Sequence, residues 1–148
     1  MAISQAMCTL FKKDLLLGDH HLDTDDIRIA LYTSSASLGA STDGYTTSNE
    51  ITNTSGSAYS AGGQQLTSVA VAENSTSGVF DAADPEWTSA TFTARGALIY
   101  NKTLYDSDNN RGGAIAVLAF GGDFTVSGGT FKIVFPAATA SNAIVRID

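Results

Sequence analysis

The sequence is short of charged residues, of basic residues in particular, and of cysteine. Charged side chains make up 16% of its 148 residues, against about 25% in an ordinary soluble domain. The eight lysines and arginines are scattered and form no basic stripe, so direct nucleic-acid binding is not expected. The single cysteine, Cys8, excludes an intramolecular disulfide and fits synthesis in a reducing compartment.

Long apolar runs are missing as well. The run from Leu15 to Leu17 is far too short to span a membrane. The N-terminus has no basic region followed by a long apolar stretch, and Lys12 and Lys13 interrupt the one candidate segment. We therefore expect neither a secretory signal nor a membrane partner.

Small residues take the place of the missing charges: the chain has 14 glycines and many serines, threonines and alanines. A hydrophobic share of 43% still predicts a packed core, and the length fits a single domain over residues 1–148. Two interpretations fit this composition. One is a β-protein with long loops, and the other is a subunit largely covered by partners, because charges are depleted at interface centres. The net charge of −7 mainly favours solubility and contact with basic surfaces.

Residues 1–18 differ from the rest of the chain. Their apolar residues recur at spacings of three and four, which predicts one helical stripe made of Ile3, Met7, Leu10, Phe11 and Leu15. Ser4 can cap the start of this helix, and Gly18 can end it in a left-handed conformation. We therefore expect an N-terminal α-helix over residues 3–18.

From Ile27 the apolar period changes to two, which predicts a strand with Ile27, Ile29 and Leu31 on one face. Similar short runs follow, and the glycine pairs at 121–122 and 128–129 are expected turns. The further expected strands cover residues 64–72, 78–80, 87–93, 97–101, 114–120, 124–126, 130–135 and 142–147. This pattern predicts a mainly-β body over residues 27–147, a single antiparallel β-sandwich or barrel-like domain.

Residues 33–63 are the least regular part of the chain and are too long for a plain connection in a compact domain. They are expected to form a functional arm or loop, or to contain a short strand near 49–52. Tyr45, Ile51 and Tyr59 are the residues expected to anchor this segment to the body.

Two histidines stand in an acidic run, where the neighbouring carboxylates are Asp19, Asp23, Asp25 and Asp26. Histidine with carboxylates can bind a transition metal. However, the side chains of the adjacent His20 and His21 point apart in an extended loop. A solvated acidic loop is therefore the favoured interpretation, and no metal or cofactor is expected there.

A second polar run has Asp106, Asp108 and Asn110 at positions one, three and five of a calcium loop. The EF-hand loop requires glycine at position six and glutamate at position twelve. Here Arg111 and Val117 occupy those positions. A polar hairpin tip is the favoured interpretation.

Catalytic candidates are weak. Cys8 would need a base and an orienting group to act as a nucleophile, and it lies in the expected helix, where a small apolar residue suits packing. Nothing places two carboxylates across a cleft for glycoside chemistry, although the candidates are Glu50, Glu73, Asp81, Asp84 and Glu86. Trp87, a possible sugar platform, is more typical of a core or interface anchor. An enzyme is not expected.

Several segments form one pattern along nearly the whole chain. The chain opens with MAISQAMCT at 1–9 and FKKDL at 11–15, and the later segments are IALYTSSA at 29–36, LGAST at 38–42, YSAGG at 59–63, WTSAT at 87–91 and ARGALIYN at 94–101. In this collinear arrangement the chain resembles small virion structural proteins of tailed bacteriophages.

The resemblance implies a virion protein made in the host bacterial cytoplasm and free of catalytic residues. Capsid decoration is its favoured form: a cement protein, expected as a homotrimer, that binds the assembled shell of the major capsid protein and stabilises it. A tail, collar or fibre-attachment protein is the alternative within the class, and a carbohydrate-binding receptor module is the alternative outside it. The N-terminal helix and residues 33–63 are the expected contact elements.

Overall fold

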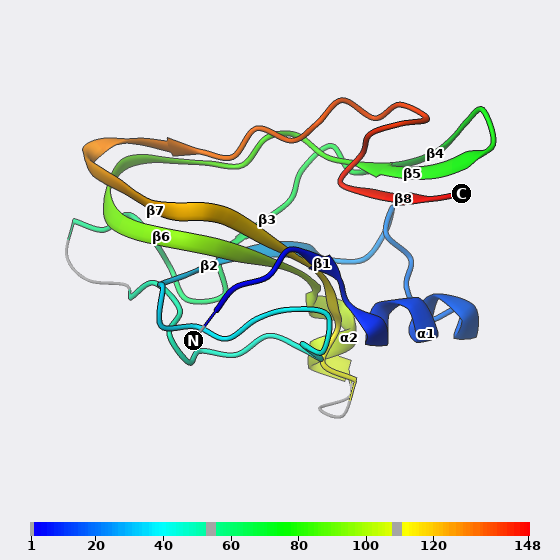
Figure 1. Cartoon of the computed structure of the whole chain (residues 1–148), viewed down its shortest axis with the longest axis horizontal. Helices are drawn as coiled ribbons and strands as arrows, with labels where there is room; N and C mark the ends of the chain where they lie inside the picture. The colour runs from blue at the N-terminus through cyan, green and yellow to red at the C-terminus, as the bar shows by residue number, and fades with distance from the viewer. Residues whose placement is uncertain (1, 53–55, 108–110) are drawn as a thin grey trace.

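Two antiparallel β-sheets form the body of the protein, as the computed structural model shows for residues 2–52, 56–107 and 111–148 (Figure 1). The five-stranded sheet has the order β1-β7-β6-β2-β3 and the three-stranded sheet the order β4-β5-β8. The strands are β1 (Ala6–Met7), β2 (Ile27–Tyr32), β3 (Gln64–Gln65), β4 (Ala70–Asn74), β5 (Ser77–Asp81), β6 (Glu86–Asn101), β7 (Ala114–Lys132) and β8 (Val145–Ile147), and the helices are α1 (Thr9–Leu17) and α2 (Lys102–Ser107). The predicted mainly-β, sandwich-like fold with an N-terminal helix is confirmed.

A ribbon made of β6 and β7 organises the fold. The two strands pair along nearly their whole length, and the ribbon folds back on itself so that its two arms lie in different layers (Figure 1). The register is irregular on the way: residues 120–123 of β7 lie opposite Arg95 alone, and Gly128 is an extra residue opposite the junction of Ala90 and Thr91. Such bulges bend a strand and increase its twist.

The prediction of turns at the two glycine pairs is therefore wrong. Gly121 and Gly128 adopt positive φ values of 79° and 66° but lie inside β7, where they form the bulges. The expected separate strands at 87–93 and 97–101 are one strand, β6, and those at 114–120 and 124–126 belong to β7. A glycine in the sequence indicates that the backbone can depart from ordinary β geometry at that position. It does not indicate whether the chain reverses direction there.

The N-terminal helix begins later than predicted. Residues before Thr9 are extended, and β1 pairs with β7 through Ala6–Val117 and Met7–Ala116. The Ser4 N–H donates to the Leu38 carbonyl instead of starting a helix, so the prediction of Ser4 as the cap is wrong. The C-terminal end is as predicted, because Gly18 has a φ of 78° and its N–H bonds back into the last turn.

Residues 33–63 do not form a free arm, which corrects that expectation for the part of the segment that the structure describes. Ile51 and Tyr59 are buried in the core, and the predicted short strand is reduced to a single bridge between Tyr32 and Glu50. The expected anchoring role of Tyr45, Ile51 and Tyr59 is confirmed, since the Tyr45 ring also stacks on Tyr100 of β6, with centroids 4.9 Å apart.

Two strand boundaries and one helix also differ from expectation. The expected strand 64–72 divides into β3 and β4, and Ser68 between them has a φ of 52°. The final strand is shorter than 142–147. Helix α2 was not predicted, although Asn101 caps it by accepting the Leu104 N–H at 3.1 Å.

The core lies between the sheets and under α1. The apolar faces of the central strands supply it, and Ile29, Leu31, Leu98, Ile115 and Val117 are fully buried. The opposite face of β2 is buried as well, since Ala30 and Tyr32 are also 0% exposed and only Arg28 is partly exposed. The prediction that only one face of this strand is buried is therefore wrong. Neither helix of the described residues has the length and apolar character needed to cross a membrane.

Candidate interaction surface

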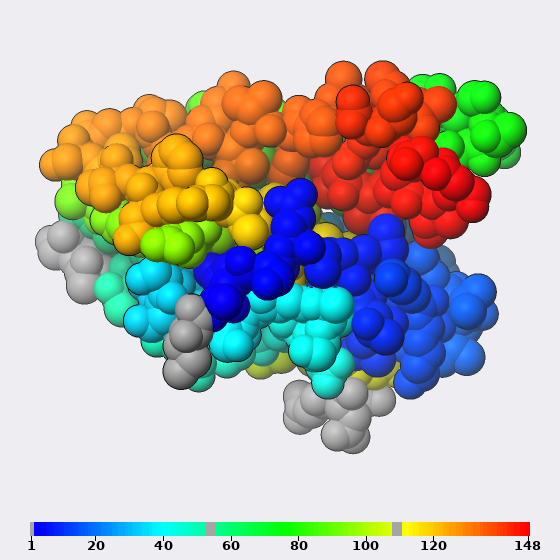
Figure 2. All heavy atoms as spheres, in the orientation of Figure 1, coloured from blue at the N-terminus to red at the C-terminus, as the bar shows by residue number. Residues whose placement is uncertain are grey.

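An apolar groove lies between the two arms of β7. Because the ribbon folds back, side chains from the first arm face side chains from the second and the short segment after it, around a volume of about 460 Å³. The groove is lined by Phe120, Phe124, Thr125, Val126, Thr130, Phe131, Lys132, Ile133 and Val134. Figure 2 shows the surface of β7 (gold to orange) at the end of the molecule away from α1 (blue).

The groove exposes large apolar side chains to solvent. Phe124 is 53% exposed and Val134 is 73% exposed. Phe120 packs its ring against both Phe124 and Phe131, with centroids 6.1 Å apart in each pair. Fully burying a side chain of this size contributes about 1.5–3 kcal/mol, so a partner that covers the groove gains binding energy from residues that the fold leaves uncovered.

The same strand also presents an unpaired edge. On the side away from β6, β7 pairs only with the two residues of β1, at Ala116 and Val117. Within the described residues no further strand covers that side from Leu118 to Lys132. An edge strand with free backbone groups is a template for another chain. The groove and this edge together make the β7 surface suited to protein–protein contact.

This surface was not predicted from the sequence. The apolar residues of 120–133 were assigned to three separate strands, at 114–120, 124–126 and 130–135. The groove exists only because the bulges fold β7 back on itself, and the sequence signal was the pair of glycine doublets in an otherwise strand-like run.

The acidic histidine run packs against the body more than was expected. The His20 ring contacts Phe11 edge-on, with centroids 4.8 Å apart. The Asn101 side-chain amide donates to Asp25 Oδ2 at 2.6 Å and lies 3.2 Å from His20 Nδ1. Buried His20 Nε2 and Asp14 Oδ2 have no hydrogen-bond partner within the described residues. His21, in contrast, is exposed, so the expectation of a fully solvated loop is wrong for His20.

No group of three or more His, Cys, Asp or Glu side chains is placed to hold a metal ion in the part of the chain that the structure describes. Burial lowers the pKa of His20, although the nearby Asp14, Asp25 and Asp19 carboxylates act in the opposite direction. The neutral imidazole is therefore the form that the fold stabilises.

We expect His20 to make the protein less stable at acidic pH. Because its pKa is lower in the folded state, the unfolded chain binds more protons as the pH falls below the ordinary value of 6.5, and stability must decrease in that window. Chemical denaturation at about pH 7.5 and about pH 5.5 measures this loss. The His20→Gln variant should lose less stability between the two pH values than the matched variant His21→Gln. Equal pH dependence in both variants would show that His20 is not responsible.

The other sequence candidates are separated in space or buried. Burial, with the nearby Asp43 carboxylate, raises the pKa of the Cys8 thiol to about 11, so the thiolate nucleophile is disfavoured. Trp87 is buried and packs on Tyr59, Phe92 and Phe131, which confirms it as a core anchor.

The polar run after β6 connects β6 to β7, as expected of a hairpin, but Asp106 lies in α2 and makes an ion pair with Lys102. The predicted positions Asp108 and Asn110 lie outside the described residues. Among the five carboxylates considered for glycoside chemistry, Glu50 is buried in the protein, and its two oxygens accept three hydrogen bonds.

Comparisons with known proteins give this chain no relative. No family model, no curated protein and no solved structure matches it. What the protein does must therefore be inferred from its own surfaces and sequence pattern.

Proposed function

We propose that this chain is a structural protein of a tailed-bacteriophage virion, most specifically a decoration protein that binds the assembled shell of the major capsid protein and stabilises it. The observation that supports the proposal is the β7 surface, where an apolar groove and an unpaired strand edge coincide. Large exposed apolar patches of this kind mark interaction sites. The resemblance of the sequence to small virion structural proteins supplies the identity of the partner.

The mechanism is mass action. A protein that binds the assembled shell and not its free subunits stabilises the shell by the free energy of that binding. Many copies on one lattice raise the avidity without strong individual contacts. Low charge and an apolar docking surface suit a subunit that is covered on several sides in the particle.

The groove variant Phe124→Ser with Val134→Ser is expected to fold normally and to bind capsid shells at least about tenfold more weakly, because alanine-type truncation of central apolar contacts has effects of that size. Both side chains are mostly exposed, so little folding energy depends on them. Co-sedimentation with shells assembled from the major capsid protein alone measures the binding, and circular dichroism checks the fold.

The matched control is Val71→Ser on β4, which removes a side chain that is also 55% exposed but lies outside the groove. Its shell binding should match that of the unmodified protein. If the groove variant binds shells as well as this control, the β7 surface is not the contact. If the unmodified protein binds isolated tails and not shells, attachment to the tail, collar or fibre replaces capsid decoration.

A further inference from the structure

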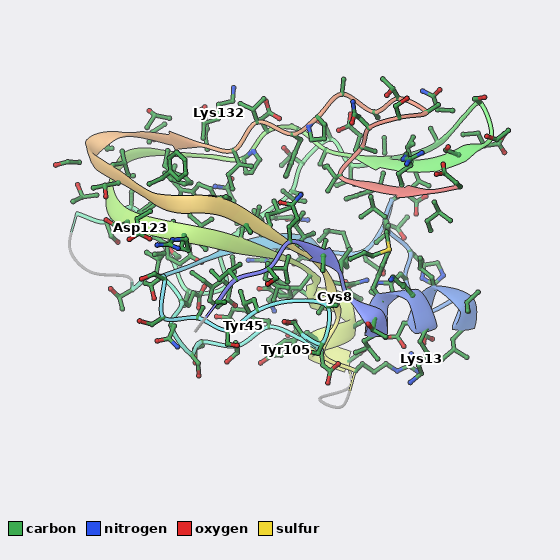
Figure 3. All side chains as sticks on the ribbon, in the orientation of Figure 1. Cys8, Lys13, Tyr45, Tyr105, Asp123 and Lys132 are labelled. Atoms are coloured by element: carbon green, nitrogen blue, oxygen red, sulfur yellow. The ribbon has the colours of Figure 1, made fainter. Side chains whose placement is uncertain are left out.

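Helix α1 is held to the rest of the protein by few side chains. Of its nine residues only Phe11 and Asp14 are buried, whereas Leu16 is 91% exposed and Leu17 is 62% exposed. No side chain caps its first turn, which also has no acidic residue, and its last turn has no basic residue. Figure 3 labels Lys13 on the side of α1 that points away from the sheets. A helix of this length is marginal on its own, so α1 belongs to the part of the fold that opens most easily.

The loop that follows α1 is fixed to the end of β6 through Asn101, which is fully buried. The Asn101 Oδ1 accepts the Leu104 N–H at 3.1 Å, so the amide nitrogen of this side chain is the donor. That nitrogen donates to Asp25 Oδ2 at 2.6 Å and lies 3.2 Å from His20 Nδ1. A neutral imidazole accepts at one nitrogen and carries its proton on the other. His20 Nδ1 is therefore the acceptor, and the proton is on Nε2.

This arrangement has no place for a second proton on His20. A protonated imidazole donates from both nitrogens, so an N–H at Nδ1 would point at the N–H of Asn101. Asn101 cannot turn its amide over without giving up its bonds to both Leu104 and Asp25. On the other side of the ring, buried Nε2 meets no acceptor within the described residues. The folded site thus fits the neutral ring and opposes the charged one.

The charged groups around His20 do not compensate for its burial. They are Asp14 on α1 and Asp19, His21 and Asp25 in the loop. Burial lowers the pKa of His20 by more than the three carboxylates, Asp14 foremost, raise it. Asp19 is already paired with Arg111, and buried Asp14 Oδ2 has no hydrogen-bond partner in the described part of the chain. Acid therefore favours any state in which the His20 ring reaches water.

We propose that protonation of His20 detaches α1 and residues 18–25 from the sheets while the sheets stay folded. The charged ring moves into water, and the Phe11 ring, 4.8 Å from it between centroids, loses that contact. Asp14 can follow, because its Oδ2 has no hydrogen bond to give up. The β6–β7 ribbon keeps the pairing along its length, so the opening ends at the sheet. This pH-operated opening goes beyond the proposed function and does not depend on it.

Hydrogen exchange at about pH 7.5 and about pH 5.5, followed by mass spectrometry, tests the proposal on the unmodified protein. At both pH values the amides of α1 should be less protected than those of β6 and β7, which identifies a local opening. On acidification the protection of α1 should fall by about three- to tenfold. The variant His20→Gln should lose less than about twofold, since glutamine stays neutral and its side-chain oxygen can accept the Asn101 N–H. The matched control His21→Gln should open like the unmodified protein.

Three results in this experiment would overturn the proposal. They are equal protection of α1 and the sheets, protection of α1 that acid leaves unchanged, and an equal loss of α1 protection in both histidine variants. NMR titration of the two rings in the unmodified protein is the second measurement, and it needs no variant to fold. The midpoint of His20 should lie below that of exposed His21, and neutral His20 should carry its proton on Nε2. A proton on Nδ1, or equal midpoints, would also refute the proposal.

Discussion

Replacing Gly63 with alanine is expected to destabilise the protein severely. Gly63 has a φ of 72°, and a Cβ atom added there would lie 1.8 Å from the Ile29 carbonyl oxygen and 2.8 Å from the Ala30 Cα. Both atoms belong to the backbone of the buried strand β2, which is fixed by pairing with β6 on its other side. The clash cannot be relieved by rotating a side chain, so the sheet itself would have to move.

The free energy of unfolding is expected to fall by more than about 4 kcal/mol, which is the effect of severe strain in a packed core. A domain of this size has about 5–15 kcal/mol of stability in total. Urea denaturation followed by circular dichroism measures the loss, and a low yield of soluble protein would be its first sign.

Gly18→Ala is the matched control for this prediction. Gly18 has a similar φ of 78°, but a Cβ atom there would have nothing within 4 Å. The variant therefore includes the strain of a left-handed alanine without the clash. We expect it to lower the free energy of unfolding by about 1–2 kcal/mol. Equal losses at Gly63 and Gly18 would mean that the loop around Gly63 moves away at little cost, contrary to the expectation.

Strand β2 shows what the sequence could predict. Its alternation of Ile27, Ile29 and Leu31 with other residues correctly indicates a strand that buries these three side chains on one face, because a strand turns every second residue to the same side. The alternation does not reveal that Ala30 and Tyr32 on the opposite face are buried as well. The fold class follows from many such runs. The need for glycine at position 63 could not be predicted, because it arises from the approach of Ile29, which is 34 positions away in the sequence.

The N-terminal segment shows where periodicity fails. Ile3 and Met7 fit a helical stripe with Phe11 and Leu15, but all four positions can also reach the core from an extended segment followed by a helix. Pairing of β1 with β7 decides between the two, since it gives the Cys8 N–H the Ile115 carbonyl as acceptor at 2.9 Å. A local pattern cannot reveal a hydrogen-bond partner that is about a hundred residues away.

The candidate surface was hidden for the same reason. Phe120, Phe124 and Phe131 were recognisable as apolar strand residues, yet whether they face the core or an open groove depends on the fold-back of β7. Leu16 and Leu17 were visible from the sequence as apolar residues of a helix. Their exposure became apparent only with the packing of Phe11 and Asp14 against the body.

Replacing Glu50 with alanine is expected to cost about 3–5 kcal/mol of stability, as removal of one partner from a buried charged network does. Glu50 is 6% exposed. Its Oε1 accepts the Tyr59 hydroxyl at 2.6 Å and the Gly62 N–H at 2.7 Å, and its Oε2 accepts the Tyr45 hydroxyl at 2.6 Å. The variant leaves these donors in a protein interior without an acceptor.

The network holds the described residues 45–52 and 56–62 against β2. The Tyr59 oxygen also accepts the Leu31 N–H at 2.9 Å, so a single chain of hydrogen bonds runs from Glu50 to the central sheet. Burial, followed by the hydrogen bond to Glu50, raises the pKa of Tyr59 well above its usual range. The fold therefore favours the protonated hydroxyl, the form that donates to Glu50.

Tyr45→Phe is the control for Glu50→Ala, because it removes one of the three donors and keeps the acceptor. Tyr45→Phe is expected to lower the free energy of unfolding by about 1 kcal/mol, the net contribution of one hydrogen bond. Urea denaturation of both variants compares the two losses. If Glu50→Ala costs no more stability than Tyr45→Phe, water reaches the donors that lost their acceptor, and the burial of Ile51 and Tyr59 is what mainly holds the segments 45–52 and 56–62 in place. A larger loss in Glu50→Ala would show instead that one buried carboxylate turns the irregular segment, which the sequence suggested was an arm, into part of the core.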